Sequence, residues 1–418
     1  MSSYARDNAP TGNSAVANRW VIAVAGFFLQ IALGAVYGWS NFLSPVMKHF
    51  NVSKPEANLT FTLALVALGI TAVFGGYLNS RFGPRTIGTI GGILYGLGVF
   101  LAGFAPSLVI LYLTYGILGG IGLGLGYIVP LAVLIKWFPD KRGFITGLAV
   151  AGFGLGAFVT SPIATALIGS VGLMDTFKYL GIAYLIVVVV ASQFLKVAPA
   201  NYAPAGWTPS SQQKTNRAAR DYTLGEALSS PRWYILWLIL ALNVTAGAAL
   251  ISVASPLAQD FAGVSAGTAA LLVSAISVFN GVGRLFWGWL SDAIGRPYTF
   301  LAIYVIQIFA FLLLSQISNF ALIFLPAALI GLCYGGGFGT MPAFAADFFG
   351  PKNAGTIYGA MLTAWSAGAI VGPILISSLA YRDALLILAG IMLVSCILPF
   401  VARMLNRTET PPTEGVPS

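Results

Sequence analysis

One arginine stands inside an otherwise apolar segment of this chain. Arg284 lies in the run 271–290, whose other residues are apolar, small or uncharged. If this run crosses a membrane and ends near Leu290, Arg284 is about 9 Å from that end at roughly 1.5 Å per residue, about 6 Å short of the midplane of a core about 30 Å thick. A guanidinium at this depth costs roughly 3 kcal/mol and usually faces a cavity and pairs with an anion. The run therefore predicts an anion-binding arginine, with a snorkelling or internally paired side chain as the alternative.

The composition places that segment in a membrane protein. Of the 418 residues, 58% are hydrophobic and 8% are charged, and the mean hydropathy is +0.86, which excludes the soluble globular class. The net charge of +9 does not indicate nucleic-acid binding, because the basic residues stand at the ends of apolar segments. The two cysteines form no CxxC pair and there is one histidine, so we expect no metal site and no cofactor.

Twelve apolar stretches predict an all-α membrane protein with twelve transmembrane helices in two six-helix bundles. They cover residues 20–45, 57–79, 86–105, 108–138, 143–170, 175–197, 233–258, 266–290, 298–317, 320–349, 355–380 and 384–404. We expect an N-terminal bundle at 1–197, a cytoplasmic linker at 198–232 and a C-terminal bundle at 233–418. In the linker, Thr223 and Glu226 can cap a short helix, an ordinary tether being the alternative.

The positive charges orient the chain. With both termini in the cytoplasm, sixteen lysines and arginines fall on the cytoplasmic side and four fall outside, namely Lys48, Lys54, Lys178 and Arg382. This asymmetry predicts a multi-pass protein of the inner (plasma) membrane with cytoplasmic termini. The first apolar stretch is too long for a cleavable signal sequence, so we expect it to remain as a span.

The two halves repeat. Adding 212 to the residue number carries Gly69, Gly83, Pro130 and Gly156 onto Gly281, Gly295, Pro342 and Gly368. A constant offset over four successive helices indicates two homologous bundles with the same orientation, and a site between them would lie near the middle of the membrane.

Two related motifs follow the second and the eighth stretch. The segments Gly76-Tyr-Leu-Asn-Ser-Arg-Phe-Gly-Pro-Arg85 and Gly288-Trp-Leu-Ser-Asp-Ala-Ile-Gly-Arg296 resemble the G-x-L-x-D-R-x-G-R signature of the major facilitator superfamily. In that family the charges of the signature pair with neighbouring helix ends and latch a gate. Ser80 occupies the acidic position of the first copy, so that copy lacks the latching acid.

Three further segments narrow the resemblance. Gly34-Ala-Val-Tyr-Gly-Trp39, Lys136-Trp-Phe-Pro-Asp-Lys-Arg-Gly143 and Phe279-Asn-Gly-Val-Gly-Arg284 are similar to segments of the monocarboxylate transporter family and its bacterial oxalate/formate antiporter branch. The likeness covers nearly the whole chain apart from the tails and the linker. It implies that Arg284 binds the substrate carboxylate, for which the planar donors of arginine are suited.

The resemblance also implies the rest of a substrate site. Residues similar to the aromatic lining of the family's cavity stand at Tyr127, Tyr334 and Phe338, and less closely at Tyr37. For each of them, packing between helices is the alternative. Oxalate carriers of this family have a lysine in the eleventh span, whereas the aligned residue here is Trp365. One positive charge in the cavity favours a monocarboxylate over a dicarboxylate.

Proton coupling departs from the family pattern. In animal members, a lysine of the first span and an aspartate four residues before the arginine take part in it, and the matching residues here are Asn41 and Asn280. Asn280 can orient Arg284 or bind the substrate, but it cannot titrate. A proton could enter on the substrate carboxylate, or through Asp260 close to a loop, or through His49 in a loop, and the sequence leaves these routes open.

These features predict an alternating-access carrier, functional as a monomer, that moves lactate or pyruvate together with a proton. Two alternatives remain. One is an anion exchanger of the oxalate/formate type, and the other, from another class, is a transporter-like sensor that binds without moving its ligand. No constellation of nucleophile, base and metal ligands is visible in the sequence, so we expect no enzymatic activity.

Overall fold

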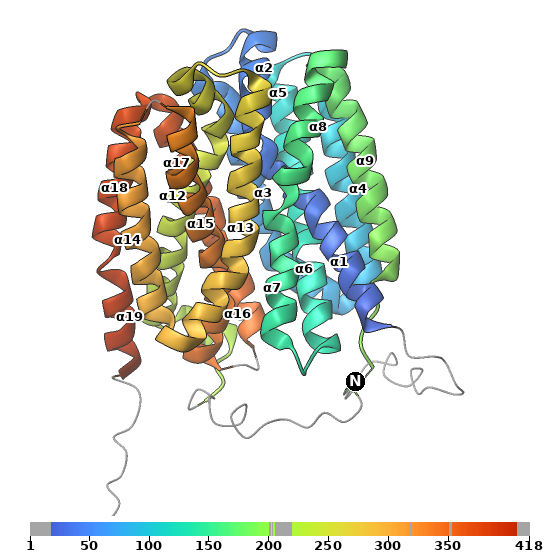
Figure 1. The fold of residues 1–418 in the computed structure, drawn as a ribbon. Helices are drawn as coiled ribbons and strands as arrows, with labels where there is room; N and C mark the ends of the chain where they lie inside the picture. The colour runs from blue at the N-terminus through green and yellow to red at the C-terminus, as the bar shows by residue number, and fades with distance from the viewer. Residues whose placement is uncertain are drawn as a thin grey trace, which may run out of the picture.

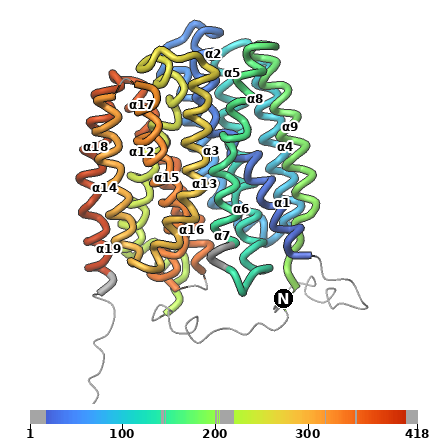
Figure 2. Tube along the Cα trace, in the orientation of Figure 1, coloured from blue at the N-terminus to red at the C-terminus, as the bar shows by residue number. Residues whose placement is uncertain are grey.

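The computed structural model describes residues 18–199, 202, 204, 220–317, 319–350 and 353–407, without the side chains of 142–144, 146, 406 and 407. Long helices that run side by side make up most of this part of the chain, and it contains no strand (Figures 1 and 2). Twelve helical segments of the described residues are long and apolar enough to cross a membrane. The predicted fold class is therefore confirmed.

The N-terminal half, residues 19–194, contains α1 (Arg19–Gly34), η2 (Ala35–Gly38), α2 (Ser40–Phe50), α3 (Lys54–Phe82), α4 (Pro84–Ala102), α5 (Leu108–Leu111), η3 (Tyr112–Leu118), α6 (Gly119–Trp137), α7 (Arg142–Gly154), α8 (Gly156–Val171) and α9 (Leu173–Phe194). The C-terminal half, residues 231–407, contains α12 (Pro231–Ala262), α13 (Ala266–Ile294), α14 (Arg296–Leu314), α15 (Phe320–Phe349), α16 (Ala354–Met361), α17 (Thr363–Ser378), α18 (Tyr381–Ser395) and α19 (Leu398–Arg407). The short helix α11 (Leu224–Leu228) lies between them and has the predicted cap of Thr223 and Glu226. Helix α1 begins and α19 ends on one face of the molecule, here named the terminal face (Figure 1).

Four of the predicted stretches are interrupted by breaks that hydropathy does not reveal. The first contains the 3-10 helix η2, the fifth breaks at Leu155, the eleventh at Leu362, and the last between α18 and α19. The break at η2 lies where two backbones meet, because a Cβ on Gly34 would lie 2.0 Å from the carbonyl oxygen of Phe153. One loop assignment was wrong, since His49 lies in the last turn of α2, whereas Asp260 lies near the end of α12, close to a loop as expected.

The two signature motifs form equivalent turns. Gly83 and Gly295, which the offset of 212 relates, end α3 and α13 with φ angles of +84° and +88°. Glycine is required there because other residues rarely adopt such angles. In the second motif, the Arg296 guanidinium lies 2.6 Å from an oxygen of Asp292 and 3.1 Å from one of Asp347. In the first motif the hydroxyl of Ser80 donates to its own helix, so among the described residues the ionic latch is present in the second copy only.

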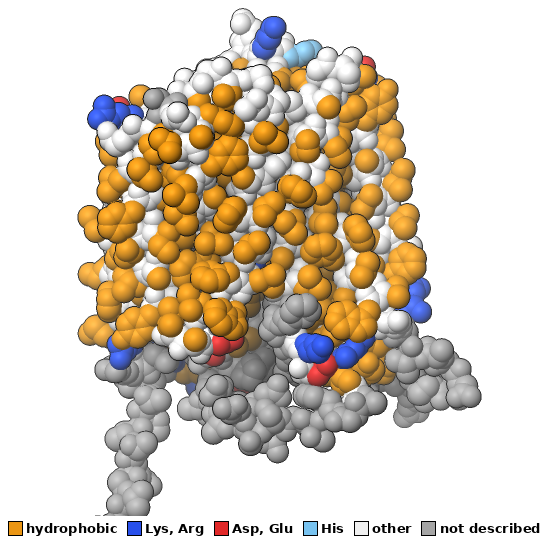
Figure 3. All heavy atoms as spheres, viewed as in Figure 1, with side chains coloured by type: hydrophobic (Ala, Val, Ile, Leu, Met, Phe, Trp, Pro, Cys, Tyr) orange, Lys and Arg blue, Asp and Glu red, His pale blue; other side chains and the backbone are white. Residues whose placement is uncertain are grey.

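The surface matches a bilayer. In the view of Figure 3, hydrophobic side chains cover a broad band, and the charged side chains gather at its upper and lower rims. Such a band with charged rims is typical of a protein surrounded by lipid.

The two halves meet at two contacts that the same offset of 212 relates. In the first, helices α7 and α8 pack on α13, and a Cβ on Gly154 would lie 2.7 Å from the Cα of Gly281. In the second, helices α3 and α17 pack together, and a Cβ on Gly69 would lie 2.8 Å from the carbonyl oxygen of Leu362. Gly69 and Gly281 occupy equivalent positions of the repeat. Because these backbones nearly touch, a side chain has no room at either contact.

A polar contact joins the halves on the face opposite to the terminal face. The ammonium group of Lys54, at the start of α3, donates to the Tyr381 hydroxyl at 2.8 Å and lies 3.6 Å from a carboxylate oxygen of Asp260. Deeper in the same interface, the amide of Asn58 donates to the hydroxyl of Ser252 at 3.1 Å. These bonds link α3 to α12 and α18, so they hold the opposite face closed.

We expect Lys54→Met to weaken this closure. A partly exposed ion pair contributes up to about 1 kcal/mol, so the population of molecules separated at this face should rise by about fivefold. Double electron–electron resonance between spin labels at positions 48 and 266, which are exposed on this face in the two halves, measures that population as a longer distance. Lys178→Met is the matched control, because Lys178 pairs with Asp175 of its own helix. Equal distance distributions in the two variants would argue against a closing role for Lys54.

Candidate functional site

Arg284 lies on α13 at the interface between the halves, and its side chain is 1% exposed. Its Nε donates to the side-chain oxygen of Asn280, one helical turn earlier, at 3.2 Å. Its Nη1 and Nη2 atoms are buried and make no hydrogen bond of ordinary geometry to the described residues. No carboxylate among the described residues pairs with this guanidinium. The side chain therefore neither snorkels to a membrane surface nor forms an internal ion pair.

Aromatic rings replace water around the guanidinium. Its Cζ atom lies 5.0 Å from the ring centre of Phe338 and 5.7 Å from that of Phe153. A desolvated cation–π contact contributes about 2 kcal/mol, whereas removing an ion from water costs several kcal/mol. The rings thus offset only part of the cost of burial, and an anion bound to Nη1 and Nη2 would supply the remainder.

Four of the predicted aromatic residues form one hydrogen-bonded and stacked group with Phe338. The hydroxyls of Tyr37 and Tyr334 lie 2.9 Å apart, and the indole nitrogen of Trp365 donates to the Tyr334 hydroxyl at 3.0 Å. The Trp365 ring lies 4.4 Å from Phe338 and 5.3 Å from Tyr127 between ring centres. Tyr37 and Tyr127 belong to the N-terminal half and the others to the C-terminal half, so the group bridges both halves.

Asn41 stands apart from this group. Its amide donates to the carbonyl oxygen of Gly38 at 3.0 Å and to the hydroxyl of Ser161 at 2.7 Å, both in the N-terminal half. Among the described contacts none joins Asn41 to Arg284. The structure therefore places seven of the eight predicted site residues together and leaves Asn41 in the packing between η2 and α8.

Two residues of the site were not found from the sequence. Phe153 stacks on Arg284, and Tyr358 of α16 has a buried hydroxyl that, like that of Tyr127, makes no hydrogen bond of ordinary geometry. Both hydroxyls interact electrostatically with Arg284. Nothing in the sequence distinguishes Phe153 from the other phenylalanines, because its role depends on the break at Leu155. We name the central cluster as Tyr37, Tyr127, Phe153, Asn280, Arg284, Tyr334, Phe338, Tyr358 and Trp365.

The polar groups of the central cluster are suited to an anion. The Nη atoms of Arg284 and the amide nitrogen of Asn280 are buried donors that have no acceptor at ordinary hydrogen-bond geometry among the described residues. The hydroxyls of Tyr127 and Tyr358 can donate as well. Among the described residues, no three His, Cys, Asp or Glu side chains lie together as metal ligands would. A planar carboxylate can accept from both Nη atoms at once.

A family model agrees with this architecture. The model described as Major Facilitator Superfamily matches residues 21–261 and 236–418. A bacterial homolog of the human lysosomal transporter Spinster, solved in an inward-facing and unoccupied conformation, has the same fold. Its TM-score is 0.73 at 15% sequence identity, over 96% of this chain and 100% of that one.

Several curated relatives are named as transporters or antiporters. The uncharacterized MFS-type transporter YhjX of Escherichia coli (strain K12) is 32% identical over 84% of this chain and 86% of its own length. The oxalate:formate antiporter of Oxalobacter formigenes is 28% identical over 92% and 91%. Monocarboxylate transporter 13 of Rattus norvegicus is 25% identical over 66% and 62%. The chain is thus a multi-pass membrane protein of the major facilitator superfamily, and it is similar to the oxalate:formate antiporter and to monocarboxylate transporters of that superfamily.

Proposed function

We propose that this protein carries small monocarboxylate anions, with lactate and pyruvate as the leading candidates, across the cell membrane. The observation that carries the proposal is the buried Arg284, whose Nη1 and Nη2 atoms have no carboxylate partner and no hydrogen bond of ordinary geometry among the described residues. The names of the relatives support the same substrate class. A single guanidinium can neutralise one carboxylate, and the cluster holds Trp365 where oxalate carriers have a second cation.

In this proposal the carboxylate accepts two bonds from Arg284 and a third from the amide of Asn280. The hydroxyls of Tyr127 and Tyr358 complete the ring of donors, and Tyr37, Tyr334, Phe338 and Trp365 close around the bound anion. Arginine remains charged at any relevant pH, so the anion is bound in its ionised form. The residues that would hold it are provided by both halves, which allows binding to influence their relative position.

Binding would also permit transport. An empty site contains an uncompensated cation that resists movement through the membrane core, whereas the loaded site is neutral. We propose that the bundles 1–197 and 233–418, joined by the cytoplasmic linker 198–232, then rock as bodies around the site within one monomer. The asymmetry of sixteen against four basic residues supports cytoplasmic termini and the inner membrane.

Two modes of coupling are candidates. Proton symport, which the family resemblance favours, needs a proton that travels with the anion. Exchange of one anion for another needs none, because the carrier then crosses only in its neutral loaded form. The second candidate is supported by the surroundings of Arg284, where no described side chain is acidic or imidazole. Asp260 and His49 lie at the opposite face, near the ends of α12 and α2, whereas Arg284 lies deep within α13.

Uptake of labelled lactate, pyruvate, formate and oxalate into proteoliposomes tests the function and its coupling. Symport predicts that an inward proton gradient drives lactate into vesicles that hold no anion and that the medium becomes alkaline. Exchange predicts uptake only into preloaded vesicles, without alkalinisation. Binding to the purified protein without uptake under either condition would instead identify a sensor and refute transport.

A further inference from the structure

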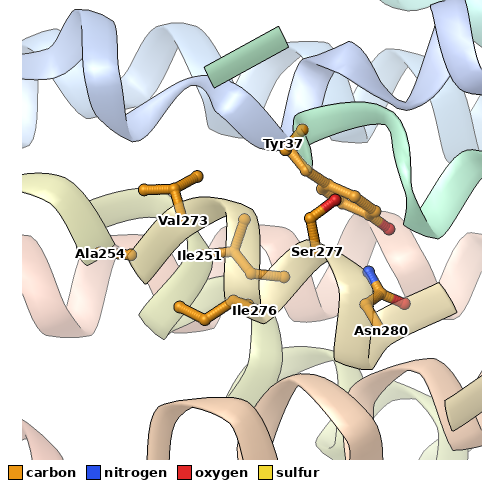
Figure 4. A pocket seen from close by; sticks show the side chains of 8 residues that line it. Tyr37, Ile251, Ala254, Val273, Ile276, Ser277 and Asn280 are labelled. Atoms are coloured by element: carbon orange, nitrogen blue, oxygen red, sulfur yellow. The ribbon is translucent and has the colours of Figure 1, made fainter. Parts of the chain in front are cut away.

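A small cavity adjoins the central cluster (Figure 4). It lies on the side of the cluster that is farther from the terminal face. Its lining is Tyr37, Ala157, Ile251, Ala254, Val273, Ile276, Ser277 and Asn280. Val273, Ile276, Ser277 and Asn280 share one face of α13 because they are spaced by three, four and seven residues. Figure 4 shows Val273 and Ala254 at one end of the cavity and Asn280 at the other. The cavity therefore extends along α13 away from Arg284.

The two ends of the cavity differ in polarity. The hydroxyl of Ser277 is satisfied, because it donates to the carbonyl oxygen of Gly154 at 2.6 Å and accepts from the backbone N–H of Phe158 at 2.9 Å. The hydroxyl of Tyr37 is paired with Tyr334. Only the amide nitrogen of Asn280 is a buried lining donor without a partner. The other end is lined by aliphatic side chains.

The orientation of the Asn280 amide follows from Arg284. The Nε of Arg284 is a donor, so the atom of Asn280 that faces it at 3.2 Å must be the oxygen. The amide nitrogen therefore faces away from Nε, and in Figure 4 it points toward Ser277 and Tyr37. Along one face of α13, the guanidinium of Arg284 is therefore followed by the amide donor of Asn280 and then by the apolar cavity.

We propose that this cavity receives the alkyl end of the transported carboxylate and sets the chain length that the carrier accepts. The proposal rests on the proposed function, because the carboxylate must be held by Arg284 and Asn280. The volume open to the centre of a water molecule is about 10 Å³, which is close to the least that one water molecule needs, so a methyl group enters only with small shifts of the lining side chains. Ile251 and Ile276 limit a longer chain, and a second carboxylate at the aliphatic end would find no donor.

The cavity can be made larger or smaller from two different helices. Ile276→Ala on α13 removes three carbon atoms from its wall, and Ala254→Leu on α12 adds three. One methylene group in an apolar pocket changes selectivity by about tenfold or more. We therefore expect Ile276→Ala to raise the ratio of butyrate to acetate uptake by about tenfold, and Ala254→Leu to lower the ratio of propionate to formate uptake by about tenfold.

The test measures uptake of formate, acetate, propionate, butyrate and malonate into proteoliposomes by each variant. Ratios between substrates are compared within one protein, so a lower yield of folded carrier does not affect them. Leu271→Ala is the matched control, since Leu271 lies on α13 but is 57% exposed and does not line the cavity, and its ratios should equal those of the wild type. Malonate should be excluded by every variant, because enlarging an aliphatic wall adds no donor.

The possible failures are distinguishable. If the wild type transports carboxylates but both variants keep its ratios, or if Leu271→Ala changes them equally, the alkyl cavity is refuted while the carrier function stands. If the wild type takes up none of the probes in either coupling mode, the proposed function is refuted and this inference falls with it.

Discussion

Replacing Arg284 with lysine is expected to reduce carboxylate uptake by about 100-fold or more. Lysine keeps the charge but loses the planar pair of donors. Two hydrogen bonds to a charged group contribute about 1.5 kcal/mol or more each, and a total near 3 kcal/mol corresponds to about 100-fold. Initial rates in proteoliposomes, normalised to folded protein, measure the effect. Arg403→Lys is the control, because Arg403 contacts Tyr298 near the terminal face and lies outside the central cluster.

The variant Arg284→Met separates the role of the guanidinium charge in transport from any role of that charge in folding. The guanidinium is buried without a protein anion, so the methionine variant should be at least as stable as the wild type in the absence of substrate. Its uptake should be abolished. Carboxylates should raise the Tm of the wild type and leave that of the variant unchanged. Accumulation of lactate by Arg284→Met would contradict the docking model directly.

The hydropathy of the sequence was sufficient to predict how many helices are long and apolar enough to cross a membrane. Each span is long and apolar because lipid surrounds it, so the pattern of the sequence alone defines it. The breaks at η2, Leu155 and Leu362 could not be predicted in this way. They accompany contacts such as that of Gly34 with the backbone of Phe153, and a glycine in the sequence does not reveal which backbone will approach it.

The sequence could predict those residues of the candidate site whose type or motif is itself informative. Arg284 was evident because a charge in an apolar run is costly, and the aromatic residues matched the pattern of a family. Phe153 and Tyr358 carried no such signal, because their positions depend on the helix breaks. The sequence could not predict the surroundings of Asn41, whose amide donates to the hydroxyl of Ser161 on α8 rather than facing Arg284.

The repeat explains why so few polar residues suffice for the site. The offset of 212 relates Gly69 to Gly281, and both lie where the halves touch. Two such contacts flank the central cluster, one between α7, α8 and α13 and the other between α3 and α17. The backbones of the halves are thereby held close together, and the aromatic rings can exclude water from Arg284 with few polar bonds between the halves, such as that of Tyr37 with Tyr334.

Gly154→Ala is expected to reduce uptake by about tenfold or more through this contact. The new Cβ would lie 2.7 Å from the Cα and N atoms of Gly281, and the backbone of α13 cannot rotate away as a side chain can. Overpacking of this kind costs about 1–3 kcal/mol, which disfavours the conformation with the halves in contact and slows each cycle that passes through it. Initial rates of counterflow, in which only the loaded carrier moves, measure the effect.

The loss of uptake should be larger where a new Cβ would meet backbone atoms than where it would meet side-chain atoms. Gly281→Ala should be milder than Gly154→Ala, because its nearest neighbours are side-chain atoms of Leu155 at 2.8 and 3.0 Å, which can shift. Gly76→Ala is the control, since no atom lies within 4 Å of its Cβ and alanine favours the helix. Equal loss of uptake in all three variants would show that helix conformation, rather than contact between the halves, is responsible. Full activity of Gly154→Ala would show that the halves need not come this close during transport.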